Sequence, residues 1–313
     1  MQSKFNEISE LADCALCPRE CHANRIAGPL GWCRADAGFS ISSICIHRGE
    51  EPAVSGRDGI CNIFFTNCNL QCTYCQNWQI SDNRIDHSRN KTGLGEVTGK
   101  IIEILGKGIK RVGFVSPSHY IPQMLAIIGE VEKRGYKPFW VYNSNGYDKA
   151  ETLKRLEGII DVYLPDLKYL DSTLSASYSK AADYPEVAVK ALKEMFRQKG
   201  SVLHTDTEGQ AESGIIVRHL VLPGEVENSR KVLQFIAGEL SPRLHVSLMA
   251  QYYPTPAVAC HPRLGRTVTP EEYGQVTDEL ERLGMHNGWV QELGSHGHYR
   301  PDFRRDHPFE SNL

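Results

Sequence analysis

The sequence predicts an α/β protein whose core is a partial (β/α)6 barrel, TIM-like but open, with a small N-terminal cysteine-rich metal-binding appendage. Beyond residue 59, short apolar runs rich in β-formers alternate with amphipathic helical stretches. Signals for tight hairpins are few, which favours parallel strands joined by right-handed crossovers. Polar residues gather where the expected strands end, as on the rim of a barrel enzyme. Six units instead of eight leave a barrel incomplete, so that it could admit a large substrate.

Six strands are expected, because each run combines apolar, β-branched and aromatic residues. They cover residues 61–66, 111–116, 138–143, 161–166, 214–222 and 244–249. Helices are expected where apolar residues recur every three or four positions, at residues 121–135, 184–200, 226–240 and 270–284. The expected domains are a cysteine-rich N-terminal module (1–58), the barrel core (59–285) and a polar C-terminal loop or tail (286–313).

Composition narrows the class of protein. The 313 residues are 41% hydrophobic and carry a formal charge of -3, as in an ordinary globular protein with one large core. No long basic run supports nucleic-acid binding, no apolar stretch approaches the ~20 residues of a membrane span, and the polar start is no signal peptide. We therefore expect a cytoplasmic protein. In a reducing cytosol, its ten cysteines are metal ligands, catalytic thiols or buried apolar residues rather than disulfides.

Three cysteines, Cys68, Cys72 and Cys75, follow the first expected strand directly. Ordinary 4Fe-4S clusters take four thiolates, one for each iron. With only three thiolates nearby, a cluster keeps one iron open, and an open metal site can bind and activate a substrate. A zinc interpretation must instead find a fourth ligand, for which the nearest histidine is His87.

A second group near the start, Cys14, Cys17, Cys21 and Cys33, supplies four thiolates. Four thiolates complete either a zinc site or a closed iron-sulfur cluster, and the residues leave both open. The isolated Cys45, Cys61 and Cys260 are each expected to be a small buried apolar side chain.

Charged residues also lie in or after buried runs. Asp166 and Lys168 are two apart, so that they face the same side of an extended segment. Arg218 lies inside an apolar strand, where an unpaired guanidinium is costly, and pairing with Asp166 or with a cofactor carboxylate would remove the cost. His219 points to the opposite face of a regular strand and is expected to be structural.

The cysteine loop, with Tyr74 before its third cysteine, resembles the signature of radical S-adenosylmethionine enzymes. The stretches "HRGEEPAVSG" (47–56) and "CQNWQIS" (75–81) resemble the subgroup related to pyruvate formate-lyase activating enzyme. "CPREC" (17–21), with Gly28, Gly31 and Cys33 after it, resembles a module that precedes the core in uncharacterised relatives of that enzyme.

This resemblance implies a 4Fe-4S cluster whose free iron binds S-adenosylmethionine. It also implies reductive cleavage to a 5'-deoxyadenosyl radical and removal of a hydrogen atom from a substrate. The substrate would be the backbone glycine of a glycyl-radical protein, or alternatively a small molecule or another protein residue. The electron donor would be a flavodoxin or ferredoxin.

The resemblance also carries roles onto individual positions. Ser116, Ser118 and His119 stand where activating enzymes have a Gly-Gly-Glu stretch that holds the methionine amino group, which is a departure from the family pattern. Asn143, Ser144 and Asn145 resemble a stretch near the cofactor or substrate. By the same resemblance, Asp166 and Lys168 are catalytic, line the site and help to hold a cation or the cofactor. Arg218 binds the cofactor, as does Tyr253 with its neighbour Tyr252.

A different class of function competes with this one. A noncatalytic iron-sulfur electron carrier or a zinc-stabilised adaptor would use the same cysteines. It predicts a fourth protein ligand beside Cys68, Cys72 and Cys75, or zinc at both cysteine groups.

Overall fold

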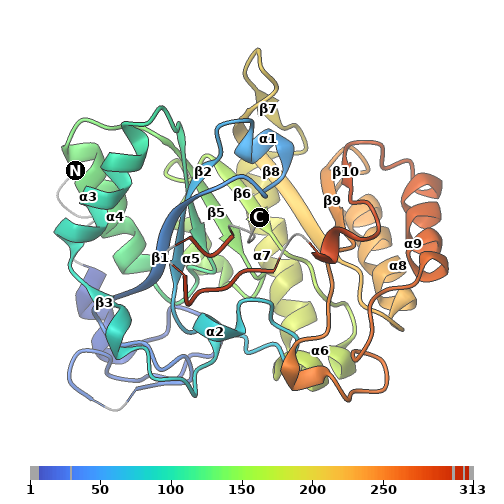
Figure 1. Ribbon diagram of the computed structural model, residues 1–313, viewed down its shortest axis with the longest axis horizontal. Helices are drawn as coiled ribbons and strands as arrows, with labels where there is room; N and C mark the ends of the chain where they lie inside the picture. The colour runs from blue at the N-terminus through green and yellow to red at the C-terminus, as the bar shows by residue number, and fades with distance from the viewer. Residues whose placement is uncertain (1–6, 29, 298–299, 306, 310–313) are drawn as a thin grey trace.

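The computed structural model describes residues 7–28, 30–297, 300–305 and 307–309. One largely parallel sheet runs through these residues and does not close into a full barrel (Figure 1). The strand order is β10-β9-β8-β6-β5-β4-β2-β1-β3, with β7 paired to β8. The strands are β1 (Phe39–His47), β2 (Ile60–Phe65), β3 (Lys91–Thr92), β4 (Arg111–Val115), β5 (Phe139–Ser144), β6 (Val162–Pro165), β7 (His204–Thr205), β8 (Ala211–Leu220), β9 (His245–Met249) and β10 (Gly288–Val290).

The expected fold class is confirmed. The six predicted strands are β2, β4, β5, β6, β8 and β9, and each pairs in parallel with the next. The strands that extend this core were not predicted from the sequence. β1 lies in the expected N-terminal module and pairs antiparallel with β2, whereas β10 lies in the expected C-terminal tail and pairs in parallel with β9.

The four predicted helices correspond to α4 (Ile121–Lys133), α7 (Tyr184–Lys199), α8 (Val226–Phe235) and α9 (Pro270–Arg282). Further helices were not predicted, because most are only a turn or two long. They are α1 (Pro52–Ser55), α2 (Trp78–Ser81), α3 (Leu94–Leu105), α5 (Ala150–Lys154) and α6 (Ser172–Ser179). The longest of these, α3, contains two glycines, which weaken its helical signal. No helix in the described ranges is both long and apolar enough to cross a membrane.

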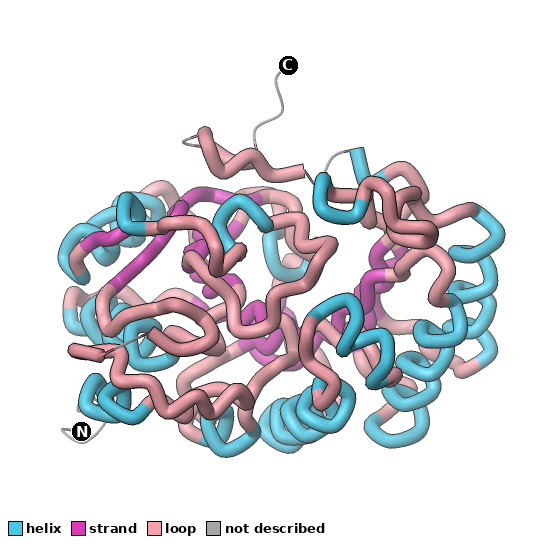
Figure 2. The backbone as a smooth tube through the Cα atoms, turned by 90° about the horizontal axis from the view of Figure 1, so that it is seen from below, coloured by secondary structure: helices cyan, strands magenta, loops and turns pink. Residues whose placement is uncertain are grey.

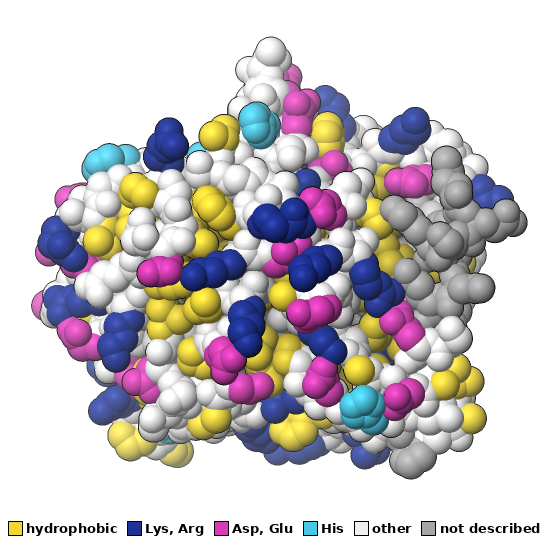
Figure 3. Space-filling model, turned by 180° about the vertical axis from the view of Figure 1, so that it is seen from behind, with side chains coloured by type: hydrophobic (Ala, Val, Ile, Leu, Met, Phe, Trp, Pro, Cys, Tyr) yellow, Lys and Arg dark blue, Asp and Glu magenta, His cyan; other side chains and the backbone are white. Residues whose placement is uncertain are grey.

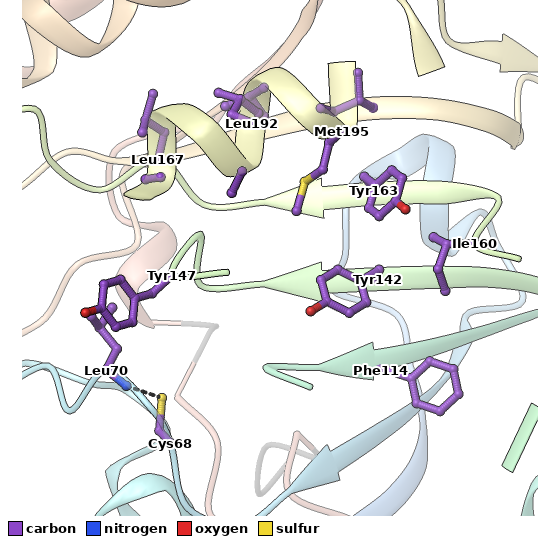
Figure 4. Close-up of a cluster of buried hydrophobic side chains, with 14 of the residues drawn as sticks. Cys68, Leu70, Phe114, Tyr142, Tyr147, Ile160, Tyr163, Leu167, Leu192 and Met195 are labelled. Atoms are coloured by element: carbon purple, nitrogen blue, oxygen red, sulfur yellow. Dashed lines mark hydrogen bonds between the residues drawn. The ribbon is translucent and has the colours of Figure 1, made fainter. Parts of the chain in front are cut away.

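The main core lies between the sheet and its helices. Figure 4 shows Phe114, Tyr142 and Tyr163 on three neighbouring strands, with Tyr163 nearest to Met195 of α7 and Phe114 furthest from that helix. Residues alternate between the two faces of a strand, so the intervening positions point to the inside of the partial barrel. Figure 2 shows the large helices on the outside of the sheet, away from the segment near the C-terminus. The inner face is therefore left to the loops and to the site.

The outer surface of the molecule carries charges of both signs. On the rear face, Lys and Arg side chains alternate with Asp and Glu, without a large area of one sign (Figure 3). This mixture agrees with the formal charge of -3.

Candidate functional site

A cavity of about 450 Å³ lies at the carboxyl ends of the parallel strands. This volume is within the range of about 300–1,000 Å³ that small-molecule sites occupy. Most of the predicted site residues line it: Cys68, Cys72, Cys75, Ser116, Asn143, Ser144, Asn145, Asp166, Lys168, Arg218, Tyr252 and Tyr253. The order of the strands thus gathers residues that are up to 185 positions apart in the sequence.

The cysteine loop connects β2 to α2 and is held by side chains on both sides. The amide oxygen of Asn83 accepts a hydrogen bond from the backbone nitrogen of Cys68 at 3.0 Å, and its amide nitrogen donates to the Cys68 carbonyl at 2.9 Å. Asn67 and Gln71 have φ angles of 65° and 69°, a left-handed conformation that is rare away from glycine. Such backbone conformations persist where the surrounding contacts fix them, often beside functional sites.

Each of the three sulfurs accepts a hydrogen bond. Asn145 donates to Cys68 Sγ at 3.3 Å, Ser179 to Cys72 Sγ at 3.1 Å and Ser81 to Cys75 Sγ at 3.2 Å. Cys68 Sγ also accepts from the backbone nitrogen of Leu70 at 3.4 Å, as Figure 4 shows. Hydrogen bonds to sulfur stabilise the negative charge of a thiolate and tune the potential of a cluster that the thiolates hold.

When no metal is bound to these thiols, their burial opposes ionisation. It raises the pKa of Cys72 to about 12, while the positive charge of Lys168 acts in the opposite direction. Burial also raises the pKa of Cys75, against the hydrogen bond from Ser81. Iron bound to the sulfurs would supply the positive charge that makes buried thiolates stable.

These three sulfurs fit a cluster better than a zinc ion. Among the described residues, no group of three or more His, Cys, Asp or Glu side chains is arranged to hold a single metal ion. One zinc ion requires all its sulfurs at about 2.3 Å from one point. A cubane takes one thiolate per iron, so its sulfurs need not converge on one point. His87 does not supply a fourth ligand here, because it lies outside the cavity and its Nε2 contacts the Asp82 carbonyl at 3.2 Å.

A row of alternating charges leads away from the cysteines. The Lys168 ammonium lies 2.5 Å from Asp166 Oδ2, and Asp166 Oδ1 lies 3.3 Å from Arg218 Nε. Burial alone would lower the pKa of Lys168, but Asp166 and Cys72 outweigh it and raise that pKa, which keeps the side chain charged. Asp166 follows β6 and Arg218 lies on β8, where the two residues form a parallel β-bridge. Arg218 therefore pairs with Asp166, as its position in an apolar strand predicts.

Two members of this row, Glu50 and Glu51, were not predicted; they lie in the loop between β1 and α1. Arg218 Nη1 lies 3.0 Å from Glu50 Oε2, and Arg218 Nε lies 3.6 Å from Glu51 Oε1. Glu50 Oε1 also accepts hydrogen bonds from Asn62 at 2.9 Å and from Asn143 at 3.3 Å. The local signal was a pair of adjacent acids ahead of a buried turn, but the partner Arg218 is 168 residues away.

The stretch 143–147 connects the cavity to the cysteine loop. Besides contacting Cys68, the Asn145 amide donates to Asn69 Oδ1 at 2.9 Å. Gly146 has a φ of 80°, and a Cβ atom there would overlap the Asp166 carbonyl and lie 2.7 Å from the Tyr184 hydroxyl. Only glycine allows this approach between the ends of β5 and β6.

Ser116 follows β4 with a φ of 50° and faces the cavity, but two of its predicted companions do not. His119 is buried, with Nε2 3.0 Å from the Thr66 carbonyl, and burial lowers its pKa to about 3. Ser118 is buried beside Asp148. The structure thus does not bring Ser118 and His119 into the cavity, because the chain turns toward α4 after Ser116.

Aromatic side chains cover the cavity on the side of the C-terminal residues. Tyr252 donates to the Leu264 carbonyl at 2.6 Å, and the Arg300 guanidinium lies 4.5 Å from the centre of the Tyr253 ring. Phe309 packs 4.0 Å from the His47 ring and 5.4 Å from Phe64, between centroids. The described part of the expected tail therefore packs beside the site, in front of β1 and β2 in Figure 1.

The N-terminal cysteines lie together but outside this cavity. Cys14, Cys17 and Cys33 are buried, whereas Cys21 is exposed. Burial raises the pKa of Cys17, and the nearby Cys33, Cys14 and Cys21 raise this pKa further through their negative charges. Like the other cysteines that the structure describes, these four are not arranged around a single metal ion.

The isolated cysteines follow the expectation only in part. Cys45 and Cys61 are buried as predicted. Cys260 is exposed, and that prediction was wrong, because the loop after β9 places it at the surface.

Comparisons with known proteins agree with the cluster interpretation. Residues 54–190 match a family described as a 4Fe-4S single cluster domain. The uncharacterized protein MJ0674 of Methanocaldococcus jannaschii is 28% identical over 277 residues, which cover 87% of this chain and 75% of that protein.

Two solved structures are also similar. A domain of pyruvate-formate lyase-activating enzyme from Bacteroides vulgatus matches 55% of this chain and 92% of its own, with 14% identity and a TM-score of 0.39. HydG, a maturase of the [FeFe]-hydrogenase, matches 77% of this chain with 14% identity and a TM-score of 0.51. The match covers 54% of HydG, so this chain spans about half of its length. The family match agrees with a 4Fe-4S cluster at the cysteine loop, and the likeness to HydG shows a shared fold.

Proposed function

We propose that this protein is a radical S-adenosylmethionine enzyme. One observation carries the proposal: among the described cysteines, only Cys68, Cys72 and Cys75 line the cavity, and each sulfur is held by a hydrogen bond. Three thiolates would hold a 4Fe-4S cluster and leave one iron without a protein sulfur. The chemistry that such a cluster supplies is one electron for cleavage of S-adenosylmethionine, which yields a 5'-deoxyadenosyl radical.

The side chains of the cavity have separate tasks in this proposal. Asn145, Ser179 and Ser81 stabilise the thiolates. Lys168 places a positive charge beside Cys72 and Cys75, which offsets their negative charge.

The other side chains of the cavity bind and shield. Asp166 and Arg218 offer a carboxylate and a guanidinium to polar groups of the cofactor or the substrate. Tyr252, Tyr253 and Phe309 would keep water from a reactive intermediate.

The substrate and partners belong to the same proposal. The stretches 47–56 and 75–81 favour the backbone glycine of a glycyl-radical protein, with a small molecule or another protein residue as the alternative. A flavodoxin or ferredoxin would supply the electron. Cys14, Cys17, Cys21 and Cys33 would hold zinc or an auxiliary cluster.

The test is to reconstitute the protein anaerobically with iron and sulfide, reduce it, add S-adenosylmethionine and measure 5'-deoxyadenosine by mass spectrometry. We expect this product from the wild type and none from Cys68→Ala, Cys72→Ala or Cys75→Ala. Cys260→Ala is the matched control, because Cys260 is exposed and away from the cavity, and it should behave as the wild type. Absence of product from protein with an intact cluster would remove the enzyme proposal. A colourless protein with two zinc ions would instead favour the adaptor.

A further inference from the structure

Glu51 is the member of the charged row whose charge is least compensated. Its side chain is 6% exposed, it lines the cavity, and its Oε2 atom has no hydrogen-bond partner among the described residues. The Nε atom of Arg218 lies 3.6 Å from Glu51 Oε1. Glu50, in contrast, receives hydrogen bonds from Arg218, Asn62 and Asn143. A buried carboxylate oxygen without a partner is costly, which makes it the natural point of contact for a ligand.

The charges in the row do not cancel. Three carboxyl groups (Glu50, Glu51 and Asp166) face two cations (Arg218 and Lys168), and burial raises the pKa of Glu51, so a further cation is needed to hold all three in the ionised form. His47 lines the same cavity, but burial lowers its pKa, and it does not supply the missing positive charge. Within the described part of the chain, Asp166 Oδ1 also has no hydrogen bond, although Arg218 Nε lies 3.3 Å away. The cavity therefore favours a ligand group that carries one positive charge.

An organic cation suits these oxygens better than a metal ion. A metal ion needs oxygens that converge on one point, and no three acidic or cysteine or histidine side chains in the described ranges do so. An ammonium group has three separate donors and can reach acceptors that are further apart. Trp289 and Phe309 line the same cavity, and aromatic faces attract organic cations.

The place of Glu51 points to the substrate rather than the cofactor. Lys168 lies at the cysteine end of the row, where its charge acts on Cys72 and Cys75. Glu51 lies at the other end, beyond Asp166 and Arg218. A ligand held at the cysteines and a second one held at Glu51 would fill opposite ends of the cavity.

We propose that Glu51, with Asp166 beside it, binds a primary ammonium group of the substrate. This inference rests on the proposed function, because it assumes that the cysteine end holds the cluster and S-adenosylmethionine. The ammonium group belongs to a small amine or to a lysine side chain of a protein target. Both sources share the chemistry that Glu51 recognises.

The test measures binding, so it does not depend on cleavage of S-adenosylmethionine. The reconstituted protein is titrated by calorimetry with n-pentylammonium and, as a neutral probe of the same shape, with n-pentanol. We expect the ammonium probe to bind about tenfold more tightly or better, the difference that a charge-assisted hydrogen bond provides. Glu51→Gln should remove this preference and leave pentanol binding unchanged. The matched control is Glu271→Gln, an exposed acid on α9, which should behave as the wild type.

Several outcomes would overturn the inference. Equal binding of the two probes to the wild type would do so without any variant, which covers the case that Glu51→Gln does not fold. Unchanged ammonium binding by a folded Glu51→Gln would also do so. If Glu51→Gln weakens binding of S-adenosylmethionine as much as that of pentylammonium, the carboxylate serves the cofactor. Displacement of the probe by Na⁺ or Mg²⁺ at millimolar concentration would show a metal site instead.

A further titration distinguishes a small amine from a lysine side chain of a protein target. The peptide N-acetyl-Gly-Lys-Gly-amide is titrated in the same way, beside its norleucine analogue. Tighter binding of the lysine peptide than of pentylammonium assigns the group to a protein side chain, and weaker binding assigns it to a small amine.

Discussion

Arg19 donates a hydrogen bond from Nε to the carbonyl oxygen of Asn69 at 2.9 Å. A second bond runs from its Nη2 to the Leu70 carbonyl at 3.3 Å. The guanidinium carbon lies 4.1 Å from the centre of the Trp32 ring and 5.0 Å from that of Tyr147. Arg19 comes from the N-terminal cysteine-rich segment, and the two carbonyls belong to the loop of Cys68, Cys72 and Cys75. One segment thus fixes the backbone of the other.

Arg19→Gln should loosen the cysteine loop before any iron is bound. Hydrogen bonds to a charged group are worth about 1.5–3 kcal/mol, and every 1.4 kcal/mol is about tenfold in an opening equilibrium. We expect about tenfold or faster hydrogen exchange at the backbone amides of residues 70–75 in the apoprotein, measured by mass spectrometry. Arg57→Gln, an exposed arginine away from this loop, is the control. Equal protection in Arg19→Gln and the wild type would contradict a clamping role.

Gly146→Ala should destabilise the protein through both conformation and overlap. The φ of 80° costs an alanine about 1 kcal/mol, and overlap of its Cβ with the Asp166 carbonyl adds about 1–3 kcal/mol. Gly158→Ala separates the two effects, because Gly158 has a φ of 73° and no atom within 4 Å of its Cβ position. We expect the free energy of unfolding in urea to fall clearly more for Gly146→Ala than for Gly158→Ala. Equal losses would show that the chain ends of β5 and β6 can move apart.

His219 should make stability depend on pH. It is buried, its Nδ1 contacts the Leu167 carbonyl at 2.7 Å, and burial lowers its pKa to about 4 from an ordinary value of 6.5. Because the folded pKa lies below the unfolded one, the unfolded chain binds the proton first as the pH falls. Stability is full above pH 6.5 and is lost as the pH falls toward 4, at about 1.4 kcal/mol per pH unit.

The matching variant is His219→Gln. Between pH 7 and pH 5, its free energy of unfolding should fall by about 2 kcal/mol less than that of the wild type. His204 is exposed, so the control variant His204→Gln should show the same pH dependence of the free energy of unfolding as the wild type. Parallel curves for His219→Gln and the wild type would show that the pKa of His219 is the same in the folded and unfolded chains.

The core strands could be predicted because each is a mostly apolar run, as in β2 and β4, whose residues are buried throughout. The added strands could not. In β1, serines interrupt the apolar residues and the pattern of burial is irregular, and β10 has only three residues. Such segments become strands because an edge of the sheet is available to them, and that edge is a product of the whole fold.

The residues of the site also fall into those that could be predicted and those that could not. Cys68, Cys72 and Cys75 could be predicted because their chemistry lies in their spacing within one loop. Arg218 could be predicted because a charge in an apolar strand requires a partner. Glu50 and Glu51 could not, since their role depends on a distant strand that the sheet order brings beside them. Ser118 and His119 were predicted from their position after a strand, but the direction of the chain after Ser116 turns them away from the cavity.

The hydrogen bonds around the three sulfurs have a consequence for the order of assembly. Their donors come from α2, from α6 and from the end of β5, while the loop backbone is held by Arg19 and Asn83. These segments meet only after most of the barrel has folded, so the three sulfurs reach their final positions late in folding. Iron and sulfide would therefore be inserted into a site that has already folded. Scaffold proteins that deliver clusters would need to bind the folded polypeptide rather than a nascent one.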